Sequence, residues 1–284
     1  LYLKKKFMEK SKILITASTG NVGSPLVNAL HKKQIPFTAA TRNRENAIKE
    51  FGFEPETVFM DFRDSSTFKP ALEEKEIVFL CGPSATPEAE ALLQPLVEQA
   101  IEQKIKHVVF IASYPSLMEK IEESDMDYTF LKGNFFMQNF EMYQTEDIKD
   151  RNQIFMPTGE GKAPFIHTRD IGEVAAEIIE NPGDFKNQKV YLTGPEALDH
   201  FQVADIFSEV LGREIKYKNP DDETYRKVMK ERGYSDKYID AMIAVFGKIK
   251  KGKVEKTSDM VRKILGRKPI TLKEYVEENK EVFS

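Results

Sequence analysis

The feature that most constrains this chain is a turn of small residues between an apolar stretch and an amphipathic one. It reads Thr16-Ala17-Ser18-Thr19-Gly20-Asn21-Val22-Gly23 and follows the apolar residues 13–15. Glycine lets a backbone approach a ligand closely, and the N–H groups and dipole at the start of a helix favour a negative charge. The spacing is almost that of a glycine-rich pyrophosphate turn, with Ala17 in place of the first glycine. It predicts a nucleotide site, although small residues at such a turn also let a helix pack against a strand.

Five apolar segments in the first half of the chain alternate with amphipathic ones. The expected strands are residues 12–16, 37–41, 57–60, 77–81 and 107–112, and the expected helices include 22–33, 45–51 and 87–104. Strands that alternate with helices pair in parallel through right-handed crossovers. The pattern predicts an α/β fold with a Rossmann doubly wound parallel sheet, which binds ligands at the carboxyl ends of its strands.

The rest of the chain is expected to be mostly helical. After a sixth strand over 127–131, it predicts a polar loop at 147–153, a short strand at 163–167, a helix over 169–180 and a strand over 190–193. Further helices are expected over 202–211, 221–231, 236–250, 258–265 and 272–279. We therefore predict an NAD(P)-binding domain over 8–155 and a smaller substrate-binding part over 156–284. Residues 1–7 are basic and precede Met8, and are expected to be a leader or an added segment.

Composition excludes several classes of function. The 284 residues are 40% hydrophobic and 31% charged, as in an ordinary soluble protein. A net charge of −4 argues against a nucleic-acid partner, which requires a basic face. Cys81 is the single cysteine, so an intrachain disulfide and a multi-cysteine zinc site are excluded. We expect a cytoplasmic protein with no metal and no membrane partner, either a monomer or a homodimer.

The end of the second expected strand bears on the choice of dinucleotide. An acid there would bind the ribose 2′-hydroxyl of NAD, whereas this chain has Arg42, Asn43 and Arg44. A guanidinium suits a phosphate, so the residues favour NADP(H) over NAD(H). The alternative is that both arginines cap a solvated strand end.

Other strand ends complete the expected cofactor site. Asp61 follows the third strand and either faces an adenine or caps the helix that begins at residues 64–66, while Asp64 is expected to cap that helix. The fourth strand ends in Cys81, Gly82, Pro83 and Ser84, and the fifth in Ala112, Ser113 and Tyr114. Cys81 is expected to be a core residue, because no histidine lies near it in sequence and a buried thiol is inert.

Five stretches together resemble the NmrA-like group of atypical short-chain dehydrogenases/reductases. They are Ile-Thr-Ala-Ser-Thr-Gly-Asn-Val-Gly (15–23), Thr-Arg-Asn (41–43), Tyr-Thr-Phe-Leu-Lys-Gly-Asn-Phe-Phe-Met-Gln-Asn-Phe (128–140), Thr-Arg-Asp-Ile-Gly-Glu-Val-Ala (168–175) and Leu-Gly-Arg-Lys-Pro-Ile-Thr-Leu-Lys-Glu-Tyr-Val (265–276). Residues 159–166 and 193–198 resemble the branch of the fungal festuclavine and agroclavine dehydrogenases, and the quinone oxidoreductase-like branch is also similar. Two departures are Ala17 and the Leu-Lys-Gly at 131–133, where the family has Leu-Arg-Pro.

The resemblance implies a set of contacts to an NADP(H) cofactor. It places the phosphate turn on residues 17–23, the 2′-phosphate contact on Arg42, and the adenine contact on Asp61 and Phe62. The turn beneath the ribose corresponds to 81–84. The wall beside the nicotinamide corresponds to 112–114 and to Gly133, Asn134 and Phe135.

No proton donor is evident from the sequence. Tyr128 and Lys132 have the spacing of a catalytic pair on a helix, but the segment alternates like a strand, so we interpret Tyr128 as structural. Weak candidates are Ser113, Tyr114 and Lys120. His167 is expected to be a hydrogen-bonded structural residue and Asp170 a cap or ion-pair partner at its helix start. The basic run over 248–253 is expected to be a solvated helix end.

Two functions are compatible with these features. The first is an NAD(P)H-dependent oxidoreductase that passes hydride to a small quinone, enone, carbonyl or iminium. Its acceptor would rest against Phe135, Phe136, Met137 and the turn leading to Phe165. The alternative is a non-catalytic NADP(H)-sensing regulator, as some members of the resembled group are.

Overall fold

The chain forms two compact units with interleaved segments. The computed structural model describes residues 11–83, 86 and 88–284. Unit 1 comprises the chain up to Leu131 together with Ala175–Lys189, and unit 2 comprises Lys132–Val174 and Val190–Ser284. This division differs from the predicted boundary between residues 155 and 156, because the chain enters unit 2 at Lys132 and then returns to unit 1 for one short segment.

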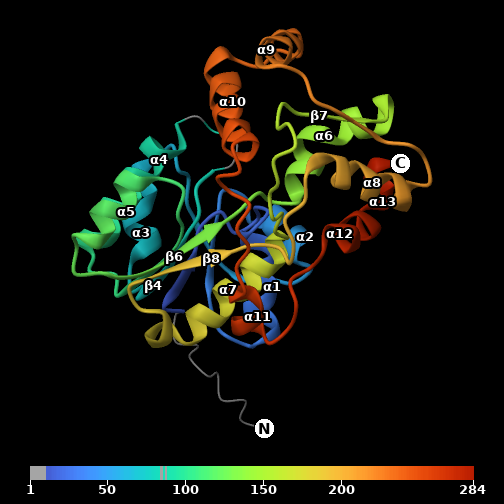
Figure 1. The fold of residues 1–284 in the computed structure, drawn as a ribbon. Helices are drawn as coiled ribbons and strands as arrows, with labels where there is room; N and C mark the ends of the chain where they lie inside the picture. The colour runs from blue at the N-terminus through green and yellow to red at the C-terminus, as the bar shows by residue number, and fades with distance from the viewer. Residues whose placement is uncertain (1–10, 84–85, 87) are drawn as a thin grey trace. The chain divides into compact units, whose positions relative to one another are not determined.

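A seven-stranded sheet carries the Rossmann architecture. Its strands follow the order β3-β2-β1-β4-β5-β6-β8, and β6 and β8 are seen side by side in Figure 1. Their bounds are β1 Ile13–Ile15, β2 Thr38–Thr41, β3 Glu56–Phe59, β4 Ile77–Leu80, β5 His107–Ile111, β6 Asp127–Gly133 and β8 Gln188–Leu192. The pairs from β3 to β6 are parallel, with Ile15 beside Ala39 on one side and Phe79 on the other. The predicted α/β doubly wound class is confirmed.

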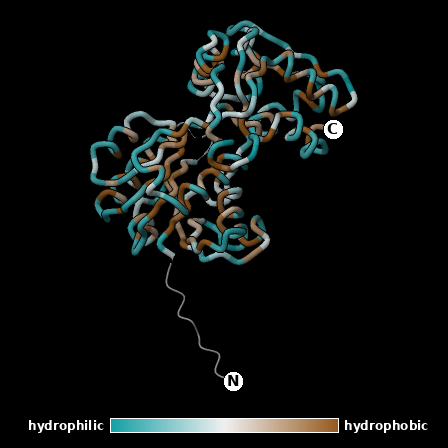
Figure 2. Tube along the Cα trace, turned by 60° about the horizontal axis from the view of Figure 1, so that its bottom comes forward, coloured by the Kyte–Doolittle hydropathy of each residue, from teal (hydrophilic) through white to brown (hydrophobic). Residues whose placement is uncertain are grey.

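The helices of unit 1 follow the strands as the alternation predicted. They are α1 Gly23–Lys32, α2 Arg44–Phe51, α3 Phe68–Leu72, α4 Ala89–Glu102 and α5 Pro115–Glu122, with short 3-10 turns η1 Ser65–Thr67 and η2 Pro182–Phe185. Helix α7, Thr168–Glu180, begins in unit 2 and ends in unit 1. Figure 2 shows hydrophobic stretches in the interior of unit 1 and hydrophilic ones on its outer loops.

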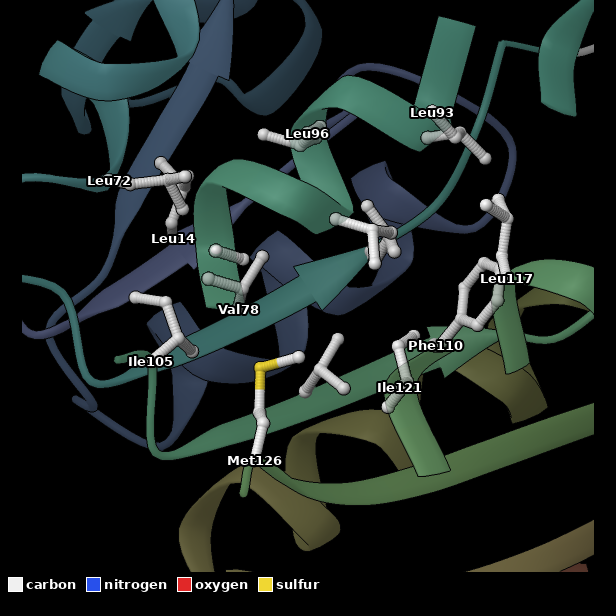
Figure 3. Packing of buried hydrophobic residues seen from close by; sticks show 14 of the residues in the cluster. Leu14, Leu72, Val78, Leu93, Leu96, Ile105, Phe110, Leu117, Ile121 and Met126 are labelled. Carbon is white, nitrogen blue, oxygen red and sulfur yellow. The ribbon is translucent and has the colours of Figure 1, made fainter. Parts of the chain in front are cut away.

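The core of unit 1 forms where α4 and α5 cover the sheet. One buried cluster contains Leu93 and Leu96 of α4, Ile121 of α5, and Val78 and Phe110 of the strands (Figure 3). All five are at most 1% exposed. Burying each such side chain contributes roughly 1.5–3 kcal/mol, so this layer fixes the sheet and the turns at its ends.

Unit 2 is mostly helical, as predicted. It also contains a small two-stranded sheet that was not predicted. Its helices are α6 Gln138–Arg151, α8 His200–Leu211, α9 Asp222–Glu231, α10 Asp236–Lys250, α11 Met260–Leu265, α12 Leu272–Glu278 and α13 Lys280–Phe283. Strands β7, Gln153–Phe155, and β9, Lys216–Lys218, pair in parallel with Ile154 beside Tyr217. The apolar signal of β9 is one tyrosine between two lysines, which is too short a pattern to identify a strand.

Two further expectations in this region were wrong. The polar segment 147–153 was expected to be a loop, but α6 continues to Arg151 because Asp147 is buried and held by Arg232. The strand expected over 163–167 forms only isolated bridges, from Ala163 to Leu198 and from Ile166 to Phe136. Among the described residues, none of the helices is sufficiently long and apolar to cross a lipid bilayer.

Candidate cofactor site

The turn after β1 is held in a shape that excludes larger residues. Ala17 has a φ of +46°, in the left-handed region where the family pattern has glycine, and its carbonyl accepts a hydrogen bond from the Gly20 N–H at 2.9 Å. A Cβ on Gly23 would lie 2.1 Å from the Ala17 oxygen, and one on Gly20 would lie 3.1 Å from it. Glycine at position 23 is therefore required by close backbone approach.

Two buried hydroxyls anchor this turn to neighbouring strand ends. The Thr16 hydroxyl donates to the Phe79 carbonyl at 3.0 Å and accepts from the Cys81 N–H at 2.9 Å. The Ser18 hydroxyl donates to the Ala40 carbonyl at 2.8 Å. Because Thr16 and Ser18 are at most 1% exposed, their side chains position the turn, whereas Thr19 and Asn21 are exposed.

The start of α1 fits a pyrophosphate. Its N-cap residue, Val22, has no hydroxyl or carboxyl and makes no side-chain cap, and the first turn contains no acid. The Ser24 hydroxyl donates instead to Glu50 of α2 at 2.8 Å. The positive end of the helix dipole is thus not neutralised by a capping side chain, which is the arrangement that binds anions at a helix start.

The end of β2 presents one unpaired arginine. Asn43 is the N-cap of α2, and its side-chain oxygen accepts from the Asn46 N–H at 3.0 Å. Arg44 forms an ion pair with Glu54. Arg42 is exposed and has no ion-pair partner among the described residues. Its guanidinium therefore remains available for a ligand phosphate.

The third and fourth strand ends are tightly organised. The Asp61 carboxylate accepts a hydrogen bond from the Arg63 N–H at 3.0 Å, and Phe62 packs on the unit 1 core. Asp64 caps η1 by accepting from the Ser66 N–H at 3.1 Å, as predicted. Cys81 is half-buried and is not the core residue that was expected, although desolvation raises the pKa of its thiol to about 12, which makes the thiol unreactive.

Gly82 faces a side chain of its own unit. A Cβ there would lie 2.8 Å from a methyl group of Leu93 in α4, so packing explains the glycine. Pro83 is half-buried, and Ser84 lies outside the described residues.

The candidate proton donors after β5 are in different environments. Ala112 is buried, and its N–H donates to the Leu131 carbonyl at 3.0 Å. Ser113 is exposed and Tyr114 is half-buried. Burial, reinforced by negative charge at Glu90, raises the Tyr114 pKa and keeps its phenol protonated. Lys120 pairs with Glu98 of α4.

Tyr128 and Lys132 both lie in β6, so they are not the helical catalytic pair, as predicted. The ring of Tyr128 stacks on Phe130 with centroids 4.2 Å apart, which gives it a structural role.

In unit 2, Asn134 organises the segment that follows β6. Its side-chain nitrogen donates to the Val254 carbonyl at 3.1 Å and its oxygen accepts from the Phe135 N–H at 2.8 Å. The Phe135 carbonyl then accepts from the Ile166 N–H at 2.8 Å. Gly133 is exposed, and a Cβ on it would lie 2.9 Å from the Phe136 ring.

The four residues expected at an acceptor wall separate into two environments. Phe135 and Phe136 are half-buried, whereas Met137 and Phe165 are 1% and 5% exposed in the unit 2 core. A Cβ on Gly194 would lie 1.9 Å from the Phe165 carbonyl, so Phe165 is held by close packing. Phe135 and Phe136 are the two that retain accessible surface.

Two polar residues at the start of α7, His167 just before the helix and Asp170 in its first turn, have structural roles, as expected. The His167 Nδ1 accepts from the Arg169 N–H at 2.9 Å, and burial lowers the His167 pKa to about 4. Buried Asp170 lies 2.7 Å from the Arg267 guanidinium and accepts from the Ile270 N–H at 2.9 Å. This pairing joins two of the resembled stretches, which sequence spacing alone did not reveal. Among the described residues, no group of three or more His, Cys, Asp or Glu side chains is placed to hold a metal ion.

Comparisons with known proteins point in one direction. The model of the NmrA-like family matches residues 9–276. NAD(P)H azoreductase from Xenophilus azovorans is 30% identical over 285 residues, which cover 95% of this chain and 99% of the relative. Agroclavine dehydrogenase from Claviceps purpurea (strain 20.1) is 29% identical over 278 residues, which cover 90% of this chain and 93% of the relative.

A solved structure has the same fold. It is an NADPH-dependent quinone oxidoreductase from Escherichia coli complexed with NADPH, with a TM-score of 0.84 at 20% identity. The match covers 94% of this chain and 99% of that one.

Proposed function

Because this chain belongs to the NmrA-like family, we propose that it is an NAD(P)H-dependent oxidoreductase that prefers NADPH and reduces a small unsaturated acceptor. The acceptor class comprises quinones, enones, carbonyls and iminium ions. The observation that supports the proposal most is in unit 1: a turn with an obligatory glycine at position 23 leads into a helix without a side-chain cap. This geometry matches a dinucleotide pyrophosphate.

The residues of unit 1 fit the other parts of NADP(H). Backbone groups of the 17–23 turn would bind the pyrophosphate, and Arg42 would bind the 2′-phosphate because Arg44 is already paired with Glu54. Asp61 and Phe62 would contact the adenine, and the turn at 81–83 would pass beneath the ribose. Residues 112–114 would contact the nicotinamide portion. When bound, the reduced nicotinamide supplies the hydride.

The acceptor would be held by apolar contact in unit 2. Phe135 and Phe136 offer half-buried rings, and Met137 and Phe165 would support them from the core. Tyr114 is protonated at neutral pH, as an ordinary phenol is, and burial raises its pKa further, so its O–H group is available as a hydrogen-bond donor. Reduction of a quinone or an iminium depends mainly on hydride placement, since water can supply any proton.

The test is NADPH oxidation across a panel of a quinone, an enone, a carbonyl and an iminium. We expect steady turnover with at least one of them. Tight NADPH binding without turnover on any acceptor would instead favour a non-catalytic NADP(H)-sensing regulator of the NmrA type.

The cofactor preference is tested by a matched pair of variants, Arg42→Ala and Arg44→Ala. Loss of a charge-assisted contact weakens binding by about 1.5–3 kcal/mol, or roughly 10- to 100-fold in Kd. We expect this loss for NADPH in Arg42→Ala, with little change for NADH in either variant. Isothermal titration calorimetry measures the Kd of each dinucleotide directly. If Arg42→Ala weakened the binding of NADPH and NADH equally, the proposed preference for NADPH would be contradicted.

A further inference from the structure

The strap, residues 253–258 between α10 and α11, is held at two points by side chains from strand ends of unit 2. The Asn134 side-chain nitrogen, just after β6, donates to the Val254 carbonyl at 3.1 Å. The Thr193 hydroxyl, just after β8, accepts from the Ser258 N–H at 2.9 Å. The three residues between these points make no hydrogen bond within the described chain. The course of the strap is therefore fixed by two side chains.

Both attachment points adjoin residues proposed to hold the acceptor. The Asn134 side-chain oxygen accepts from the Phe135 N–H at 2.8 Å, so one amide joins the strap to the acceptor wall. Thr193 precedes Gly194, where a Cβ would lie 1.9 Å from the Phe165 carbonyl. The centroids of the Phe135 and Phe165 rings are 6.4 Å apart. The strap is thus attached beside one residue of the wall at its start and near the other at its end.

The strap has an apolar contact to the wall and a low barrier to local movement. Val254 is half-buried and packs on the same unit 2 cluster as Phe135. Lys253, Glu255 and Lys256 are exposed. A segment without ladder or helix hydrogen bonds opens locally at a lower free-energy cost than the elements around it. Its position consequently depends on its two attachments.

We propose that the strap forms one side of the acceptor site, with Val254 as its contact to the acceptor, and that Asn134 and Thr193 are positioning residues that hold it there. The inference rests on the proposed oxidoreductase function. The resemblance implies a nicotinamide contact for Asn134, but its amide nitrogen and oxygen each have a partner within unit 2. Asn134 therefore acts on the acceptor through the strap and does not act on the cofactor.

The experiment releases each attachment separately. Asn134→Asp keeps an oxygen for the Phe135 N–H but cannot donate to the Val254 carbonyl. Thr193→Val removes the hydroxyl and keeps the branched shape of the side chain. Thr193→Ser retains the hydroxyl and is the matched control.

Trypsin digestion of the full-length protein reports the strap directly, because Lys253 and Lys256 are exposed within it. Loss of one hydrogen bond should raise the rate of cleavage after these lysines about 2- to 10-fold in Asn134→Asp and Thr193→Val. Cleavage after Lys237, exposed near the start of α10, should not change, which shows that the variants remain folded. Thr193→Ser should be cleaved as the wild type is.

Steady-state kinetics with the acceptor that is turned over fastest then test the role of the strap. In Asn134→Asp and Thr193→Val we expect the KM for the acceptor to rise about 2- to 10-fold, with kcat little changed and the NADPH Kd unchanged. The double variant should lose less than the product of the two single losses, because both act on one segment.

Weaker NADPH binding in Asn134→Asp alone would make Asn134 a cofactor contact and overturn the inference. Faster cleavage of the strap without a change in acceptor KM would also overturn it. If the wild-type protein oxidises NADPH with no acceptor, the proposed function fails separately, and calorimetric titration of menadione into the NADP-loaded proteins decides the inference. Weaker binding in Asn134→Asp and Thr193→Val than in Thr193→Ser supports it, and equal or absent binding in all proteins overturns it.

Discussion

The residue that best shows how this site is built is Ala17, which occupies the left-handed region with a Cβ. An L-residue in this region is strained by roughly 1–2 kcal/mol relative to a right-handed conformation. The strain is maintained by neighbours: Thr16 and Ser18 are tied to β4 and β2, and the Ala17 carbonyl lies where Gly23 passes it. The turn is therefore set before any ligand arrives.

Ala17→Gly is expected to stabilise the protein. Relief of about 1–2 kcal/mol of strain exceeds the roughly 0.4–1 kcal/mol that glycine costs through the freer unfolded chain, so the net gain is about 0.5–1 kcal/mol. Urea unfolding measures this gain in the free energy of unfolding. Ala244→Gly, at an exposed position in the interior of α10, is the control and should destabilise by about 1 kcal/mol. If both variants destabilised the protein to the same extent, the interpretation that the Ala17 backbone is strained would be contradicted.

At the level of single elements, the C-terminal half of α6 is anchored through the buried Asp147 carboxylate. Its main partner is Arg232, while Gln153 donates a hydrogen bond to it and Arg151 lies 3.6 Å away. The Arg232 guanidinium at the end of α9 donates two hydrogen bonds to the Asp147 carboxylate, at 2.6 and 2.9 Å. Asp147 is 1% exposed, and the guanidinium carbon lies 5.7 Å from the centre of the Phe155 ring. A charged residue from α9 thus attaches that helix to α6 and β7.

Arg232→Ala should destabilise unit 2 strongly, because it leaves a buried carboxylate without its main partner. Removing one member of a buried pair costs about 3–5 kcal/mol, whereas an exposed pair contributes about 0–1 kcal/mol. Arg226→Ala is the matched control, since Arg226 also lies in α9 but pairs with the exposed Asp240 of α10. Chemical denaturation should separate the two variants, and similar losses would show that Asp147 is satisfied by other groups.

The elements that could be predicted from sequence are those with local signals. Strand-then-helix alternation predicted the sheet, and Asp64 and the small turn at 16–23 were recognised by local chemistry. The extent of α6 was missed because Asp147 looks like a loop residue until Arg232, far along the chain, neutralises it. Strand β9 was missed because its pairing with β7 joins short segments that are distant in sequence.

The candidate site shows the same limit. Arg42 and Arg44 look equivalent in sequence, and only the position of Glu54 distinguishes them. Likewise Met137 and Phe165 resemble wall residues as strongly as Phe135 does, until packing against Gly194 and the unit 2 helices buries them. Hydrophobicity alone does not say whether a side chain faces a core or a ligand.

At the scale of the whole molecule, buried histidines make stability sensitive to acid. His167 and His200 are 8% and 0% exposed, and burial lowers the pKa of each from 6.5 to about 4. The Thr158 hydroxyl lies 2.9 Å from the His200 Nδ1 and fixes that ring in the unit 2 core. Because the unfolded chain binds protons more readily at these sites, the free energy of unfolding falls as the pH drops from 7 toward 4.

The expected loss between pH 7 and pH 5 is about 2 kcal/mol for each of these two histidines. The carboxylates whose pKa is lowered, such as Glu76 and Glu274, titrate below this window. Urea unfolding at the two pH values measures the loss, and the double variant His167→Gln/His200→Gln should show a smaller difference. Part of the remainder is due to buried His107, whose pKa is also lowered by burial. An equal difference in the double variant would assign the acid sensitivity to other groups.

The interleaving of the two units has a consequence for the order in which a ribosome delivers them. Helices α1–α5 and strands β1–β6 emerge first, yet unit 1 also needs residues 175–189, which follow the first segment of unit 2. Until β8 is synthesised, the nascent sheet ends at β6 with an open edge. The nucleotide turn at 16–23 is thus complete early in translation, while the sheet that supports it remains exposed to mispairing or chaperone capture until more than half of the chain has been made.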